Sequence, residues 1–196
     1  MKFQIKTRDM ILVAMFAALI AVGAFIKIPI GTVPISLQGF FVNLAGMLLG
    51  SQLGALSALV YLILGLIGIP IFTSGGGIGY IFNPGFGFLI SFIFGAASTG
   101  YFSHKLKKVS FIKLLGICYI SNIIIYSIGV PYFYFIMNSY LGKNFTITQT
   151  LISCVAVFIP GDFLKMCLAS FIGSKIIPIL RKTGYIKGDV STHAAA

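Results

Sequence analysis

Charged residues are scarce in this sequence, and acidic residues are the scarcest. Only 9% of the 196 residues are charged, and just three of them are acidic. A soluble domain usually carries about 25% charged residues, so most of the surface of this chain must face something other than water. Several apolar runs reach the roughly 18–20 residues that a helix needs to cross a bilayer. The sequence therefore predicts an all-α integral membrane protein.

Histidine and cysteine are also rare, which argues against a catalytic or metal centre. His104 and His193 lie near the ends of apolar runs, and Cys118, Cys154 and Cys167 have a spacing that fits no zinc or redox motif. The chain lacks a GxxxxGK[ST] phosphate loop. An intramembrane enzyme would need a nucleophile or metal cluster within its spans. We therefore expect neither enzymatic activity nor a cofactor.

The apolar runs divide the chain into six predicted spans within a single domain, residues 1–196. The second span is short, and a glycine-rich break separates the third from the fourth. The predicted spans cover about 10–28, 37–49, 53–69, 86–102, 111–137 and 148–180.

Basic residues mark the ends of these spans. The formal net charge is +11, but the cations do not line one face of a soluble element, so we do not expect nucleic acid as a partner. Short cytoplasmic loops are enriched in lysine and arginine, and six spans bring all three clusters to one side. Both termini are then cytoplasmic. The clusters are Lys2, Lys6 and Arg8; Lys105, Lys107, Lys108 and Lys113; and Lys175, Arg181, Lys182 and Lys187.

Two opposite charges, Asp162 and Lys165, interrupt the last apolar run in the stretch "PGDFLKM". Three positions apart, they share one face of a helix, and each alone would cost about 2.5–3.5 kcal/mol at the centre of a span. They can form an ion pair that fixes helix packing, take part in a proton relay, or bind a polar ligand. A relay needs a chain of carboxylates or histidines, which the spans lack, so we favour a ligand.

The glycine-rich break "TSGGGIGYIFNPG", residues 73–85, has too little side chain for a stable helix. It is either a flexible external loop or a segment that folds back over a site. In the second case Gly77 and Gly79 would offer backbone N–H groups. Tyr80 and Asn83 favour this alternative, because an aromatic ring and an amide are groups that orient small ligands.

The connector between the first two spans offers another polar group. Pro29 and Pro34 end the first helix and keep the connector extended. Gln38 then lies near the outer surface. It is either a ligand contact or a residue at the start of the second helix whose hydrogen bonds are satisfied within the protein.

Small residues recur at helical spacing. Ala14 and Ala18 share one face of the first helix, and Gly46, Gly50 and Gly54 repeat every fourth position. Such spacing lets helices approach closely in lipid. These faces serve either internal packing or docking onto another membrane subunit, and the alanines are the better docking candidates.

Three motifs together resemble the BioY family, the biotin-binding substrate (S) components of energy-coupling factor (ECF) transporters. They are "VPISLQ", the block "GLIGIPIF…GGGIGYIFNPGFGF" and "PGDFLK", and the resemblance extends over nearly the whole chain. Ser36 departs from the threonine expected there, which leaves the chemistry unchanged. The resemblance implies a six-helix protein of the bacterial cytoplasmic membrane that binds biotin with high affinity near its external face.

The resemblance also implies partners and site residues. A transmembrane coupling subunit would dock on Ala14 and Ala18, and two cytoplasmic ATPases would drive uptake. Alternatives are an S component for another vitamin and a self-sufficient secondary transporter. The ligand contacts that the family pattern implies are Asp162, Lys165, Asn83, Tyr80 and Gln38.

Overall fold

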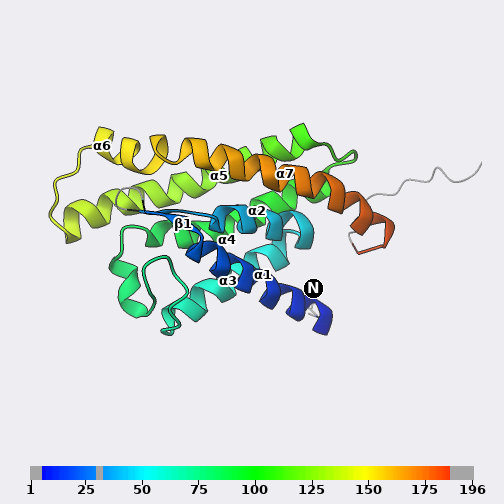
Figure 1. The fold of residues 1–196 in the computed structure, drawn as a ribbon, viewed down its shortest axis with the longest axis horizontal. Coiled ribbons are helices and arrows are strands. Elements are labelled where there is room, and N and C mark those ends of the chain that lie inside the picture. Colours follow the sequence, from blue (N-terminus) through cyan, green and yellow to red (C-terminus); the bar gives the residue numbers. More distant parts are fainter. Residues whose placement is uncertain (1–5, 30–32, 186–196) are drawn as a thin grey trace, which may run out of the picture.

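The computed structural model describes residues 6–29 and 33–185, and nearly all of them are helical (Figure 1). Lys2 and Lys187, two of the predicted cytoplasmic cations, lie outside these ranges. The helices are α1 (Thr7–Phe25), α2 (Gln38–Leu49), α3 (Ser51–Leu66), α4 (Phe86–Lys105), α5 (Phe111–Phe135), α6 (Ile147–Leu151) and α7 (Ile159–Lys182). The shorter elements are the strands β1 (Lys27–Ile28) and β2 (Ile35–Ser36), the 3-10 helix η1 (Ile78–Phe82), and the π-helical turns η2 (Ile136–Tyr140) and η3 (Ile152–Ala156).

Four helical stretches among the described residues are long and apolar enough to cross a membrane: Thr7–Phe25, Phe86–Lys105, Phe111–Tyr140 and Ile147–Lys182. The predicted class, an all-helical membrane protein, is confirmed. The helices α2 and α3 are apolar but have only 12 and 16 residues. At about 1.5 Å per residue neither spans the roughly 30 Å hydrocarbon core.

The first and third predicted spans end earlier in the structure than the apolar pattern suggested. Helix α1 ends at Phe25, and Ile28 lies in β1, which pairs antiparallel with β2. Pro29 explains this, because a residue before proline avoids the helical region. Helix α3 ends at Leu66, and Gly68 follows with φ of +111°, the left-handed conformation that commonly ends a helix.

The last predicted span, residues 148–180, is not one continuous α-helix. It consists of α6, the π-helical turn η3, a turn at Val157 and Phe158, and then α7. Pro160 lies in the first turn of α7, where its missing N–H costs nothing. The proline therefore marks where a new helix begins.

Helix α2 lies at the centre of the molecule and contacts α1, α3, α4 and α7. Figure 1 shows α5 and α7 running side by side, and these two helices are in contact. Glycines allow the closest approaches around α2. A Cβ atom on Gly46 would lie 2.4 Å from the Ala96 carbonyl oxygen, and one on Gly54 would lie 2.8 Å from the Gly46 Cα. These two glycines therefore serve internal packing.

The described members of the three basic clusters lie at one end of the molecule. The Arg181 guanidinium group donates to the carbonyl oxygens of Lys107, at 3.3 Å, and of Ser103 and His104, at 3.4 Å. The Arg8 guanidinium carbon lies 4.4 Å from the centre of the Tyr185 ring. The end of α7 thus contacts the α4–α5 connection, Tyr185 just after it contacts the start of α1, and Figure 1 shows these segments at the same end of the molecule.

We predict that Gly100→Ala destabilises the protein by about 1–3 kcal/mol, the usual cost of overpacking. A Cβ atom at Gly100 would lie 2.3 Å from the Ser51 backbone nitrogen, and a backbone atom cannot move aside as a flexible side chain can. The control is Gly116→Ala on α5, where no atom lies within 4 Å of the added methyl group. Thermal unfolding in detergent should show a lower midpoint for Gly100→Ala only, and equal midpoints would contradict this packing.

Candidate functional site

A cavity lies where β2, α2, α4, α5, α7 and the 73–85 segment converge. Its volume is about 70 Å³, below the roughly 300–1,000 Å³ of typical small-ligand pockets. The apolar and glycine residues that line it are Val33, Pro34, Gly39, Gly85, Phe88, Leu89, Phe92, Ile125 and Phe158. The polar ones are Ser36, Gln38, Thr73, Tyr80, Asn83, Asn122, Tyr126, Asp162 and Lys165.

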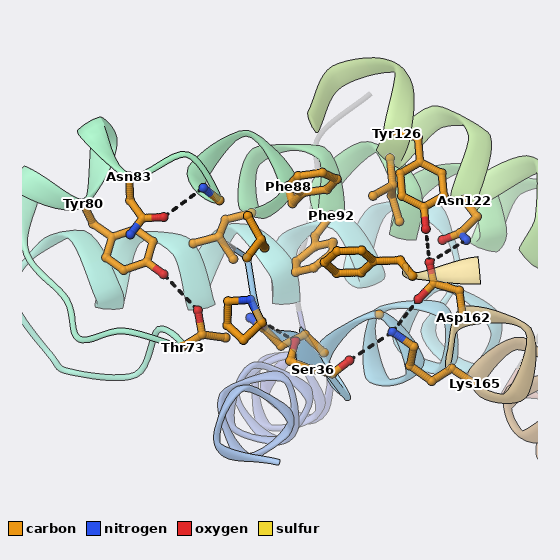
Figure 2. Close-up of a pocket in the computed structure, with 18 residues that line it drawn as sticks. Ser36, Thr73, Tyr80, Asn83, Phe88, Phe92, Asn122, Tyr126, Asp162 and Lys165 are labelled. Atoms are coloured by element: carbon orange, nitrogen blue, oxygen red, sulfur yellow. Dashed lines mark hydrogen bonds and ion pairs between the residues drawn. The ribbon is translucent and has the colours of Figure 1, made fainter. Parts of the chain in front are cut away.

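Asp162 and Lys165 form an ion pair at one end of the cavity, with 2.5 Å between Lys165 Nζ and Asp162 Oδ1 (Figure 2). The other carboxylate oxygen, Oδ2, accepts hydrogen bonds from Asn122 Nδ2, at 3.0 Å, and from the Tyr126 hydroxyl. Lys165 also donates to the Ser36 carbonyl oxygen at 3.0 Å. Only 12% of each charged side chain is exposed. The pair is therefore buried and linked to α5 and β2.

The helix break explains why a carboxylate is tolerated here. Asp162 lies in the first turn of α7, and its backbone N–H bonds to the Phe158 carbonyl oxygen at 2.8 Å. The start of a helix carries a partial positive charge that stabilises a nearby anion by about 0.3–1 kcal/mol, or up to about 2 in partly buried sites. The carboxylate thus receives support from the backbone as well as from Lys165.

The opposite end of the cavity is formed by the 73–85 segment, as Figure 2 shows. The Thr73 hydroxyl lies 3.0 Å from the Tyr80 hydroxyl. The Asn83 side-chain oxygen accepts a hydrogen bond from the Gly85 N–H at 2.8 Å, so the amide NH₂ is the group that Asn83 offers to a ligand. Phe88 and Phe92 lie between the two polar ends. The cavity is polar at both ends and aromatic in the middle.

Gln38 lines the cavity as the first residue of α2, but both ends of its side chain are engaged. Its oxygen accepts from the Ser36 hydroxyl at 2.8 Å, and its nitrogen donates to the Tyr61 hydroxyl at 2.6 Å. Tyr61 in turn donates to the Ile71 carbonyl oxygen at 3.1 Å. This chain of hydrogen bonds joins the start of α2 to α3 and to the segment after it.

The structure brings together five of the seven predicted ligand contacts: Asp162, Lys165, Asn83, Tyr80 and Gln38 all line the cavity. Gly77 and Gly79 are not among the lining residues. The Gly77 N–H donates to the Gly65 carbonyl oxygen at 2.7 Å, so it holds the loop against α3.

The two predicted docking residues, Ala14 and Ala18, are both exposed on α1, whereas Ala17 between them is buried. The two alanines therefore lie on a face of α1 that the rest of the described chain leaves open.

Asn122 and Tyr126 are site residues that sequence reasoning missed. They are four positions apart, so they lie on one face of α5, and that face meets Asp162. A polar pair at this spacing in an otherwise apolar run was a usable signal. Thr73, the first residue of the glycine-rich segment, also lines the cavity and lies outside the predicted contacts.

A second hollow, a groove of about 1,000 Å³, lies between α5 and the α6–α7 region. It is lined mainly by apolar side chains such as Ile123 and Phe163. Asn122, Tyr126 and Asp162 line both this groove and the cavity. The three side chains therefore form the wall between the two hollows.

The cavity offers hydrogen-bond donors, a carboxylate and aromatic surface, a set suited to a small molecule with polar ends and an apolar body. Within residues 6–29 and 33–185, no three His, Cys, Asp or Glu side chains come together as a metal site would require.

Comparison with known proteins gives consistent matches over nearly the full chain. A probable biotin transporter BioY from Lysinibacillus sphaericus is 39% identical over 184 residues, covering 94% of each chain. The biotin transporter BioY from Rhizobium etli is 36% identical and covers 88% of this chain and 94% of its own length. The probable biotin transporter BioY from Pyrococcus horikoshii is 37% identical, covering 87% and 97%.

A solved structure also matches. The crystal structure of the S-component for biotin from an ECF-type ABC transporter superposes with a TM-score of 0.79 at 31% sequence identity. The match covers 95% of this chain and all of that one. The model of the BioY family matches residues 1–182. This chain therefore belongs to the BioY family, a family of transport proteins and not of enzymes.

Proposed function

We propose that this protein is the high-affinity biotin-binding S component of an ECF-type importer of the bacterial cytoplasmic membrane. The observation that carries the proposal is the cavity, in which a buried carboxylate–ammonium pair faces an amide and a tyrosine across aromatic rings. Biotin transporters of similar sequence and an S-component for biotin of similar structure support it.

The chemistry of biotin suits these groups. Its ureido ring has two N–H donors and one carbonyl acceptor. Asp162 can accept from an N–H, and Lys165 or the Asn83 amide can donate to the carbonyl. Lys165 is alternatively a partner for the valerate carboxylate. Phe88, Phe92 and Tyr80 would contact the apolar body of the ligand. A positively charged ligand such as thiamine is disfavoured by Lys165.

The small volume of the cavity, about 70 Å³, implies that side chains must move when biotin enters. We expect the aromatic rings between the polar ends to rotate, because the polar residues are held in place by hydrogen bonds. Entry of biotin would then widen the cavity as these rings turn.

The orientation follows from the two ends of α7. Asp162 lies in the first turn and Arg181 in the last, so about 28 Å separates them at about 1.5 Å per residue. The basic end belongs on the cytoplasmic side by the positive-inside rule. The cavity then lies toward the external face. In this proposal α2 and α3 complete a single domain of six membrane-embedded helices with both termini in the cytoplasm.

Uptake would be driven by partners, a transmembrane coupling subunit and two cytoplasmic ATPases. The exposed alanines Ala14 and Ala18 provide a flat face on α1, and small residues allow another helix to approach closely. We propose this face as the docking site of the coupling subunit.

We predict that Asp162→Asn and Lys165→Ala each weaken biotin binding by roughly thirtyfold or more. Truncating one partner of a buried charge pair typically costs about 2–5 kcal/mol, because the other charge is left unpaired. The matched control is Lys175→Ala, which removes an exposed lysine from the same helix. Calorimetry on purified protein, with biotin, thiamine and riboflavin as ligands, measures the effect.

Wild-type affinity in both variants would show that the ion pair serves packing alone. Tight binding of thiamine or riboflavin in place of biotin would assign the protein to another vitamin. Biotin uptake by vesicles that contain only this chain would indicate a self-sufficient transporter instead of an ATPase-driven one.

We predict that Ala14→Trp leaves biotin affinity unchanged but prevents assembly with the coupling subunit, because a large ring would hold the helices apart. The control is Ile112→Trp, which places the same ring on α5 at a residue that is 78% exposed. Co-purification of each variant with the coupling subunit and ATPases is the measurement. Intact assembly of Ala14→Trp would contradict the docking role.

A further inference from the structure

The two oxygens of the Asp162 carboxylate have different surroundings. Oδ2 accepts two hydrogen bonds from α5, from Asn122 and from Tyr126. Among residues 6–29 and 33–185, Oδ1 is bound by Lys165 alone. A carboxylate offers about four acceptor positions, about two on each oxygen. Oδ2 is therefore fully occupied by protein groups, and Oδ1 keeps one position for a ligand.

The Lys165 ammonium group is divided in the same way. Of its three N–H donors, one meets Asp162 Oδ1 and another meets the Ser36 carbonyl oxygen. One donor remains. The ion pair thus presents one acceptor and one donor side by side to a ligand. The other hydrogen-bonding positions of the two charged groups are occupied by protein groups.

Tyr126 and Asn122 determine this arrangement from a different helix. They lie 36 and 40 residues before Asp162 in the sequence and are one helical turn apart on α5. Both line the groove as well as the cavity, as Asp162 does, so their bonds to Oδ2 lie in the wall between the two hollows. Without their donors the carboxylate would be free to turn toward the groove or to accept a second donor from the ligand.

We propose that Tyr126 and Asn122 are positioning residues for ligand recognition. They fix the rotation of the Asp162 carboxylate, occupy Oδ2, and leave Oδ1 as the single acceptor for an N–H of the ligand. This inference rests on the proposed binding of biotin in the cavity, and it assigns to α5 a role in affinity that acts through α7.

The test compares Tyr126→Phe with Tyr119→Phe. Tyr119 lies two turns earlier on the same helix, lines the same groove and is 61% exposed, so it controls for loss of a hydroxyl group on this face of α5. Hydrogen bonds to charged groups are among the stronger ones. Tyr126→Phe should therefore weaken biotin binding about tenfold, which is a shift of about 1.4 kcal/mol. Tyr119→Phe should leave the affinity unchanged.

A double-mutant cycle separates positioning from a purely structural role. If Tyr126 acts through the carboxylate, Tyr126→Phe should cost less than about twofold in an Asp162→Asn background, because coupled residues are not additive. Titrations are carried to millimolar biotin so that weak variants are still measured. Thermal unfolding in detergent checks folding, and Asn122→Ala, which removes the other donor, replaces Tyr126→Phe if that variant does not fold.

Three results would overturn the inference: wild-type affinity in Tyr126→Phe, an equal loss in Tyr119→Phe, or equal losses with and without the carboxylate. A lower unfolding midpoint with unchanged affinity would likewise show that the two residues only stabilise a buried acid. Failure of the wild-type protein to bind biotin would instead reject the proposed function, which the first titration reveals before any variant is compared.

Discussion

The site depends on one carboxylate placed inside a membrane-embedded bundle. Asp162 is bonded by Lys165 from its own helix and by Asn122 and Tyr126 from α5. A charge in such a place is costly without partners, so the helices that supply the partners must meet at this point. The contact of α5 with α7, the break before α7 and the attachment of β2 through Lys165 all converge on it.

The rest of the fold holds that convergence in place. Helix α2 is short and central, and glycines let its neighbours approach within backbone contact. Tight packing of small residues replaces the hydrophobic driving force that lipid does not provide. The polar chain from Ser36 through Gln38 and Tyr61 to Ile71 then fixes the start of α2 against α3. These hydrogen bonds therefore connect both polar ends of the cavity to α2 and α3.

Local features of the sequence predicted much of this arrangement. Two charges in an apolar run identified Asp162 and Lys165, because few residues are as costly in a span. The motifs shared with the family identified Tyr80, Asn83 and Gln38, which line the same cavity. Length and hydropathy predicted the helical membrane class, and the three basic clusters, as far as the structure describes them, meet at one end.

Features that arise from packing between distant segments could not be read from the sequence. Helix α5 carries apolar residues around most of its circumference, so the spacing of Asn122 and Tyr126 indicates that they share a face but not that this face meets α7. The sequence predicts that the Gly77 N–H is available to a ligand. In the structure it donates to the carbonyl oxygen of Gly65, near the end of α3. A proline such as Pro160 disfavours a continuous helix, but the position at which α7 begins depends on how α6 and η3 pack.

The narrowness of the cavity has a consequence for rates. A site that must open before its guest can enter associates more slowly than a rigid, open one, whose rate constant is typically about 10⁵–10⁷ M⁻¹ s⁻¹. The apparent affinity is also reduced by the fraction of time spent closed. For a given dissociation constant, slow entry requires equally slow escape. A captured molecule would then escape slowly, and any contact that widened the space between Phe88 and Phe92 would speed both its entry and its escape.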